Sequence, residues 1–421
     1  MTGKYLIMNK EMKINSKPYR EEVLKWKPEP TAGGELARIR EQAFHRFQEL
    51  GFPTRQHEAW KYIYLDSILN TVYTPASASG IETDQGSLPS SVRISSLESG
   101  FEKLPHVYQN WLKNRIAVEE NVFSLINEFQ NKEGLLVFYS KNMILERSLQ
   151  FSLTVPEPSG SEPFIFYPRI CFVLEEGVKA EVILNHSSFT QHPYFMNAMV
   201  DIYLAEGAEL RLSSIQHGIA DTSAFMKIAA TLQKKSRFEM ISFTQGGLTS
   251  RQETQVDFRG SEASCHLKNL SVLRGVSRFY QHATANHYAG ECQSNQLFKT
   301  ILAGEAQSEV NSLVHVVRDA QKSESRQLNR NLILSDKARI YSRPQLKIYA
   351  DDVKCSHGAA TGQLDDSELF YLRSRGISKE QARLMMTLAF AEEVIQLIEP
   401  KTLRDEIEKI VKKELEGIVK H

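Results

Sequence analysis

The spacing of apolar residues changes twice along the chain. Near the N-terminus apolar positions recur at helical spacing over residues 34–50, where Gly51 and Pro53 end the pattern, and again over 118–129. The middle of the chain carries short apolar runs and alternating strands instead, and helical spacing returns near the C-terminus. The pattern therefore predicts three domains, at residues 1–133, 134–362 and 363–421.

The middle segment repeats one unit: an apolar strand, a tight turn and an alternating strand. Its turns, near Gly177, Gly207, Lys235, Ser261, Gly304 and Asp336, lie about 26 to 32 residues apart, with one gap near 43. Such a period in β-rich sequence indicates a solenoid or a propeller, because one unit cannot bury its apolar face without neighbours. A β-sandwich is an alternative with a similar pattern.

The segment on the N-terminal side of the β region contains signals for a linker and for individual helices. Residues 71–100 are rich in Ser, Thr, Gly and Pro, which predicts a long loop or linker. Glu119 and Glu120 begin the helix expected over 118–129, where carboxylates suit the positive end of the helix dipole. Over residues 52–69 we expect Trp60 and its neighbours to anchor a helix to the rest of the domain.

The C-terminal segment predicts two long helices. Ser378 and Gln381 have the spacing of a capping box at the start of the first helix, which ends before Pro400. The second helix is expected over residues 403–415, with Gly417 as its stop.

Composition narrows the class of protein. The 421 residues include 51 basic and 51 acidic side chains, which gives no support for a nucleic-acid or anionic-membrane surface. No apolar run is long enough to span a membrane, and the first residues have too short an apolar core for a signal peptide. Four widely spaced cysteines without a CxxC motif argue against a disulfide framework, so we expect a reducing, cytoplasmic setting, with Met8 or Met12 as a possible start.

Candidate chemistry concentrates in residues 350–362, ADDVKCSHGAATG. In an extended segment Cys355 and His357 fall on the same face, and both residue types suit zinc, copper or iron–sulfur chemistry. A neighbouring cation such as Lys354 would favour the thiolate. Two ligands do not close a four-coordinate site, so the others would come from elsewhere in the fold or from another chain. A small buried cysteine without such a role is the structural alternative.

This stretch, with residues 320–349 before it and 369–382 after it, resembles the SufB/SufD family of iron–sulfur cluster assembly scaffolds, and SufD more than SufB. The segment Glu58-Ala59-Trp60-Lys61-Tyr62 resembles an E-x-W-[KR]-Y segment of SufD, and residues 281–299 resemble the spaced histidines and CQSN of the family. Val310 and Ser312 depart from it, because an aromatic residue and a glycine are usual there.

The resemblance implies a right-handed parallel β-helix core flanked by α-helical N- and C-terminal domains. It also implies a non-catalytic scaffold that pairs with SufB and binds the ATPase SufC, with Cys355 and His357 as candidate ligands of a transient iron–sulfur cluster shared with SufB. The SufC face would include Arg373, Met385, Met386 and Phe390, unless these residues pack on the core. Suf scaffold complexes have been associated with a flavin, but no residues place one here.

Other functions remain open at this point. A second ligand set would draw on polar residues of the β region, and a polar ladder along a solenoid face is the favoured alternative; these residues are His266, His282, Asn286, His287, Gln293, Asn295, Lys299 and His315. A SufB-like homodimeric scaffold and a carbohydrate-active β-helix enzyme are the competing functions. No phosphate-loop or dinucleotide motif is present, which excludes an ATPase of that type.

Overall fold

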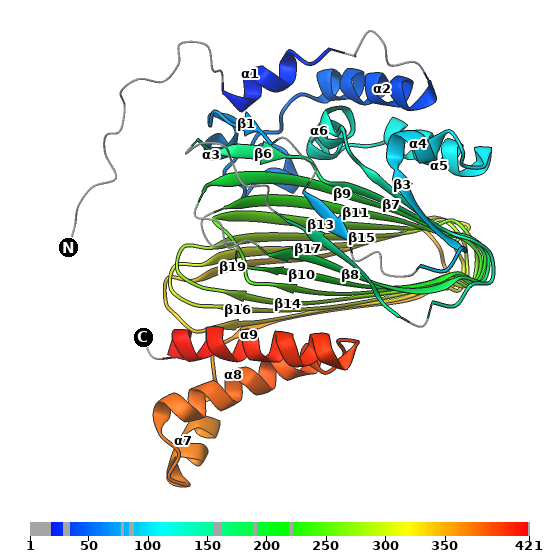
Figure 1. Ribbon diagram of the computed structural model, residues 1–421. Helices are drawn as coiled ribbons and strands as arrows, with labels where there is room; N and C mark the ends of the chain where they lie inside the picture. Colours follow the sequence, from blue (N-terminus) through cyan, green and yellow to red (C-terminus); the bar gives the residue numbers. More distant parts are fainter. Residues whose placement is uncertain are drawn as a thin grey trace, which may run out of the picture.

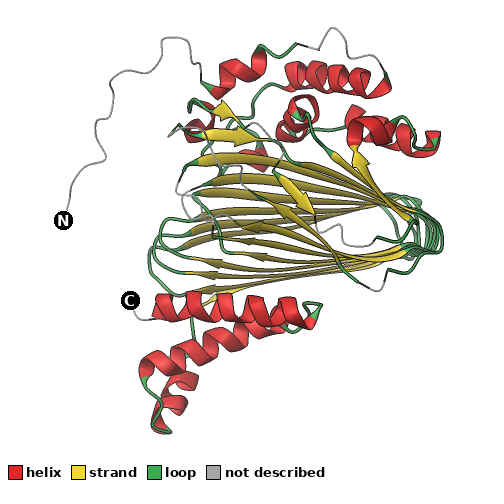
Figure 2. Ribbon diagram, in the orientation of Figure 1, coloured by secondary structure: helices red, strands yellow, loops and turns green. Residues whose placement is uncertain are grey.

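The computed structural model describes residues 18–27, 34–76, 80–83, 88–145, 147–154, 162–187, 192–218 and 222–419. A parallel β-solenoid occupies the centre, with one group of helices above it and a second group below it (Figure 1). Strand accounts for most of the regular structure, as the colouring by secondary structure shows (Figure 2). The predicted β-helix core flanked by helices is confirmed. The proposed start at Met8 or Met12 lies outside the described residues.

Two sheets, here called sheet A and sheet B, form the walls of the solenoid. Sheet A contains β3 (Val92–Ser96), β4 (Leu135–Tyr139), β7 (Arg169–Leu174), β9 (Tyr194–Leu204), β11 (Ser223–Leu232), β13 (Thr249–Phe258), β15 (Arg278–His287), β17 (Gln307–Val316) and β19 (Arg339–Ile348), with β1 (Thr74–Pro75) and β6 (Phe164–Phe166) beside this path. Sheet B contains β2 (Ile81–Thr83), β5 (Leu149–Leu153), β8 (Lys179–Ser187), β10 (Glu209–His217), β12 (Arg237–Thr244), β14 (Ser264–Leu273), β16 (Gln293–Leu302), β18 (Glu324–Ile333) and β20 (Lys354–Gly362).

From β7 onward the chain alternates between the sheets, so each strand pairs in parallel with the strand two places earlier. The first turns are closed differently, because β3 and β2 add to their sheets antiparallel. Within the described residues β19 and β20 end the strand order of their sheets. We call the N-terminal end, where β2 and β3 add antiparallel, the capped end, and the end formed by β19 and β20 the free end.

One corner of the solenoid repeats a left-handed backbone conformation. Its residues, Gly177, Gly207, Lys235, Glu262, Glu291 and Lys322, all have φ between 59° and 67° and lie 27 to 31 residues apart. Gly246, Gly275 and Gly304 mark another corner. The turns expected from the sequence include Ser261 at the first corner and Gly304 at the second, which produces the apparent gap near 43 residues. The repeat itself has no such gap.

The interior changes character along the solenoid axis. In sheet B one inward-facing row runs through Met240, Leu267, Gln296, Gln327 and His357 at successive register positions. The first two join the main apolar cluster, and the two glutamines are buried. This row is thus apolar near the capped end and polar near the free end.

The N-terminal helices cover the outer face of sheet A (Figure 1). They are α1 (Tyr19–Leu24), α2 (Glu35–Leu50), the 3-10 helix η1 (Glu58–Trp60), α3 (Asp66–Leu69), α4 (Leu97–Phe101), α5 (His106–Ala117) and α6 (Val122–Gln130). The helix predicted over 34–50 is confirmed as α2. The linker predicted over 71–100 is wrong at its end, where β3 pairs with β4 and Ser96 caps α4.

The second predicted N-terminal helix begins later than expected. Asn121 caps α6, because its side chain accepts a hydrogen bond from the Phe123 amide. Glu119 precedes this helix and serves another role: its carboxylate is buried and accepts from Lys227 Nζ at 2.6 Å. The helix-dipole role assigned to Glu119 is therefore wrong.

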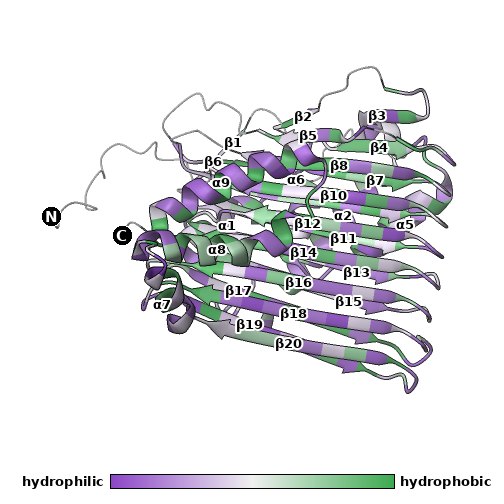
Figure 3. Ribbon diagram, turned by 90° about the horizontal axis from the view of Figure 1, so that it is seen from below, coloured by the Kyte–Doolittle hydropathy of each residue, from purple (hydrophilic) through white to green (hydrophobic). Residues whose placement is uncertain are grey.

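The C-terminal helices are α7 (Asp366–Ser374), α8 (Lys379–Ile395) and α9 (Lys401–Val419). The view from below shows α8 and α9 lying across the strands of sheet B, with β18 and β20 beyond them (Figure 3). The capping box of Ser378 and Gln381 is confirmed, with both of its hydrogen bonds present. Gly417 does not stop the last helix, which continues to Val419. None of the described helices combines the length and apolar character that crossing a bilayer requires.

Candidate functional site

Strand β20 places the Cys-x-His pair at the free end of the solenoid. It pairs in parallel with β18, so Cys355 lies beside Ser325 and His357 beside Gln327. Ser325 and Gln327 are both buried. Because strand side chains alternate, Cys355 and His357 share the inward-facing side of the last turn, as predicted.

The two side chains differ in exposure. Cys355 is partly buried and packs against the apolar cluster of the interior, whereas His357 is exposed. Burial raises the pKa of the Cys355 thiol, and a hydrogen bond to the Ser325 backbone opposes this effect. The thiol is therefore protonated near neutral pH in the isolated chain, and deprotonation would have to accompany metal binding.

Lys354 does not activate the thiol. Its ammonium group points to the opposite face and pairs with Glu324 at 3.1 Å. The expected lowering of the Cys355 pKa by this neighbour is wrong, because burial dominates. Asp351 and Asp352 are exposed in the turn before β20, where the Asp352 carbonyl accepts from the Lys322 amide at 2.6 Å.

Other polar residues of the β region lie on separate faces. His282 is buried beneath the N-terminal helices, 3.3 Å from the Arg251 guanidinium and 3.2 Å from Glu309 Oε2. His287 faces the interior, where it stacks on Phe258 and hydrogen-bonds Ser294 Oγ at 2.9 Å. His315 lies edge-on to Tyr288 and Tyr349. These contacts support the polar-ladder interpretation over a second ligand set.

The described residues contain no group of three or more His, Cys, Asp or Glu side chains placed to hold a metal ion. Three of the cysteines, Cys171, Cys265 and Cys292, are buried and unpaired. Burial raises the pKa of each thiol, to about 11 for Cys292. Within the described part of the chain, Cys355 is thus the most accessible thiol.

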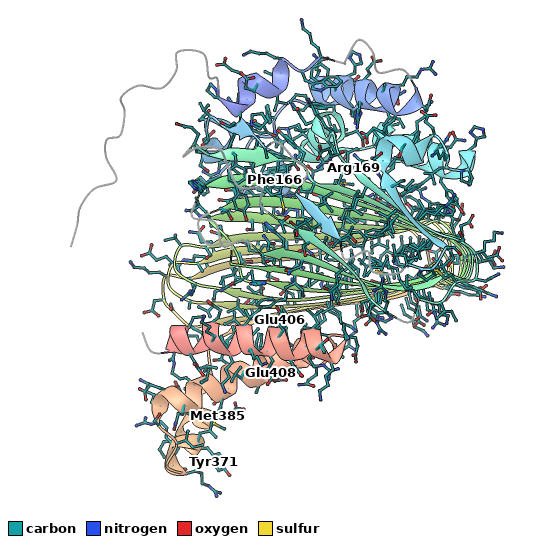
Figure 4. The ribbon with its side chains drawn as sticks, viewed as in Figure 1. Phe166, Arg169, Tyr371, Met385, Glu406 and Glu408 are labelled. Atoms are coloured by element: carbon teal, nitrogen blue, oxygen red, sulfur yellow. The ribbon has the colours of Figure 1, made fainter. Side chains whose placement is uncertain are left out.

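A helical arm formed by α7 and the first part of α8 extends away from the solenoid, whereas the end of α8 packs on sheet B (Figure 1). Among the residues predicted to bind a partner, Arg373 is exposed, Met385 is 49% exposed and Met386 is partly exposed. Phe370 and Tyr371, at 73% and 57% exposed, were not singled out from the sequence. The sequence signal for them is that Phe370 and Tyr371 directly follow Leu369 at the start of a helix. Leu369 is the buried residue of this helix, so its two neighbours point outward. Tyr371 and Met385 mark the far part of the arm in Figure 4.

Phe390 faces the solenoid instead. The Lys299 ammonium on β16 lies 4.4 Å from the centre of its ring and donates to its carbonyl oxygen at 2.8 Å. Glu393, one turn further along α8, pairs with Lys299 and with Arg330 of β18. In register, Lys299 lies beside Arg330, and Arg330 lies beside Ala360 of β20. This joint links the arm to the turns that carry Cys355 and His357.

Comparison with known proteins gives consistent matches. The family described as "SUF system FeS cluster assembly, SufBD core domain" matches residues 158–390. The chain is 27% identical to the iron–sulfur cluster assembly protein SufD of Escherichia coli, covering 87% of this chain and 90% of that protein. It is 31% identical to a SufBD family protein of Synechocystis, over 82% and 76%. It is 30% identical to the chloroplastic protein ABCI7 of Arabidopsis thaliana, over 58% and 52%.

Proposed function

Because the chain belongs to the SufBD family of the SUF iron–sulfur cluster assembly system, we propose that it is a SufD-like, non-catalytic scaffold subunit. It pairs with a SufB-like chain through the free end of the solenoid. It binds a SufC-like ATPase through the arm of α7 and α8. The nascent cluster is the cargo of this complex, not a resident cofactor of the chain.

The observation that carries the proposal is the position of Cys355 and His357 on the last strand of sheet B. A thiolate and an imidazole are two of the ligands that an iron–sulfur site needs. Among the described residues no strand lies beyond β20, so a second chain can add strands to the backbone groups of this free edge. A SufB-like partner docked there supplies the remaining ligands.

The first prediction concerns His357. His357→Ala removes a ligand without disturbing packing, because the side chain is exposed. We expect an unchanged melting temperature and a severalfold loss of cluster assembly by the purified complex, measured as iron and sulfide bound. His45→Ala, at an exposed position on α2, is the matched control. Assembly at the wild-type level in His357→Ala would remove His357 from the site.

The second prediction concerns the arm. Tyr371→Ala truncates an exposed aromatic side chain, a residue type that dominates binding energy at interfaces. We expect SufC-like ATPase binding to weaken by about 2 kcal/mol, or roughly thirtyfold, in titration calorimetry. Glu408→Gln, an exposed position on α9, is expected to bind normally. Equal affinity in Tyr371→Ala would mean that the ATPase binds elsewhere.

A further inference from the structure

The side chains of the segment around Trp60 point in two directions, and the two groups have different roles. Trp60 is buried against Phe123 and Phe225, which explains it as an anchor of the N-terminal domain. Lys61 and Tyr64 point outward, and Tyr64 is 45% exposed. Anchoring does not account for these outward residues, which have no role in the function proposed above.

The outward residues gather with two strands of sheet A into one surface. We call it the Tyr64 patch and define it as Arg55, Lys61, Tyr62, Tyr64, Arg278 and Tyr341. Tyr62 stacks on Tyr341 of β19, with ring centres 4.0 Å apart and nearly parallel planes. The Arg55 and Arg278 guanidinium groups lie 4.7 Å and 5.3 Å from the centre of the Tyr64 ring.

The two halves of the patch are joined by a hydrogen bond, which Arg55 Nε donates to the Lys61 carbonyl oxygen at 3.3 Å. Tyr280 lies in the outer row of β15, two strands from Tyr341 in register, and is buried at 1% exposure. Burial, with smaller contributions from Glu309 and the phenols of Tyr64 and Tyr341, raises the pKa of Tyr280 to about 12, although Arg278 opposes the shift. The patch therefore spans the N-terminal segment, β15 and β19, with β17 and its buried Glu309 between the two strands.

Three cations of this patch have no carboxylate partner. Within the described residues no Asp or Glu forms an ion pair with Arg55, Lys61 or Arg278, and Arg278 Nε is buried without a hydrogen-bond partner. Neighbouring Arg343 shows the contrast, because it pairs with Glu58 and with Glu309 at 3.2 Å. Positive charge is thus left uncompensated on a surface where tyrosine rings hold the guanidinium groups in place.

We propose that the Tyr64 patch is a docking surface for an acidic segment of a partner protein. Carboxylates complement its three free cations, and tyrosine with arginine is the combination enriched where protein interfaces gain most of their binding energy. The patch includes Tyr341 of β19, the terminal strand of sheet A, so a chain docked at the free end can reach it. Three cations on a chain with no net charge are too few for a nucleic-acid surface.

The test uses the full-length chain and fluorescein-labelled peptides in anisotropy titrations. The first peptide is a glutamate–leucine repeat, and a glutamine–leucine repeat is its neutral counterpart. We expect the acidic peptide to bind, more weakly as salt rises, and the neutral peptide not to bind. Arg55→Glu with Arg278→Glu is expected to weaken the acidic peptide at least about tenfold and to create binding of a lysine–leucine peptide.

The control is Lys412→Glu with Lys413→Glu, which makes the same charge change at exposed positions of α9. Arg55→Gln with Arg278→Gln gives a milder loss if the reversed variant does not fold. The proposal is overturned if the acidic peptide does not bind the wild-type chain, or binds all variants equally. It is also overturned if a single-stranded RNA binds more tightly with the same dependence on Arg55 and Arg278. None of these outcomes depends on the ATPase or on cluster assembly.

Discussion

The two outer faces of the solenoid are both covered by helices, but by different chemistry. On sheet A a chain of ions, most of them buried, joins strands to the N-terminal helices; its members in order are Glu128, Arg169, Asp201, Arg115, Glu119, Lys227, Glu253 and Arg251. On sheet B the contact with α8 and α9 is mainly aliphatic, through residues such as Ile241, Val272, Val394 and Ile407.

The two kinds of contact differ in how strictly they fix the position of the helices on the sheet. A buried ion pair returns little net stability, because desolvation opposes the attraction, but a displaced partner leaves a costly unpaired charge. The N-terminal helices are therefore held in one position on sheet A. Aliphatic packing is non-directional, so the cover on sheet B is stabilised mainly by the area it buries. Its charged contacts with the strands include Lys299 and Arg330 with Glu393, and Arg274 with Glu414.

The largest loss of stability is expected for a substitution in the ion chain on sheet A. Arg169 is 1% exposed and contacts the carboxylates of Glu128 and Asp201. Arg169→Met leaves these charges buried without it, so we expect the free energy of unfolding to fall by about 3–5 kcal/mol in urea denaturation. Lys141→Met breaks an exposed pair with Glu176 and should cost less than about 1 kcal/mol. Similar losses in both variants would contradict the role given to the buried chain.

A smaller effect is expected on sheet B. Ile407 of α9 is fully buried against the outer face of the sheet. Ile407→Ala removes apolar contact and leaves a cavity, so we expect a loss of about 3 kcal/mol in the same assay. Ile144→Ala, at a site 66% exposed, is the control and should be nearly neutral. A neutral Ile407→Ala would show that α9 does not depend on this packing.

The smallest expected effect is a change in how steeply the free energy of unfolding depends on pH. Burial, assisted by Arg251, lowers the pKa of His282, while Glu309 and Glu253 oppose the shift. The unfolded chain thus binds a proton near pH 6.5 that the folded chain does not, so stability falls as pH drops below that value. His282→Gln should reduce this acid slope by up to about 1.4 kcal/mol per pH unit between pH 6.5 and 5.

The matched control for this slope is His45→Gln, at an exposed position on α2. It removes a histidine that is not buried, so a reduced acid slope in His282→Gln but not in His45→Gln would assign that slope to His282. An acid slope in His282→Gln equal to that of the wild type would mean that His282 takes up its proton equally in the folded and unfolded chain.

Local signals in the sequence were reliable where one element decides its own structure. The helical spacing over residues 34–50 and the capping box of Ser378 and Gln381 both appear as expected. The alternation that placed Cys355 and His357 on one face needs only a strand, and β20 provides it. The linker expected over residues 71–100 was wrong from Val92 onward, because polar composition suggests a loop while the pairing of β3 with β4 overrides that tendency.

By itself the sequence determined the repeating β unit, the helical ends and the Cys-x-His pair, because each depends on residues close together in the chain. Only the tertiary structure decided which charges meet. Lys227 and Glu119 pair across 108 positions, and Arg343 and Glu58 across 285. The same holds for the Tyr64 patch, whose residues come from the N-terminal segment and from two distant strands. Contacts of this kind depend on how the solenoid turns stack and on which helices cover them. A local sequence pattern contains no information about either.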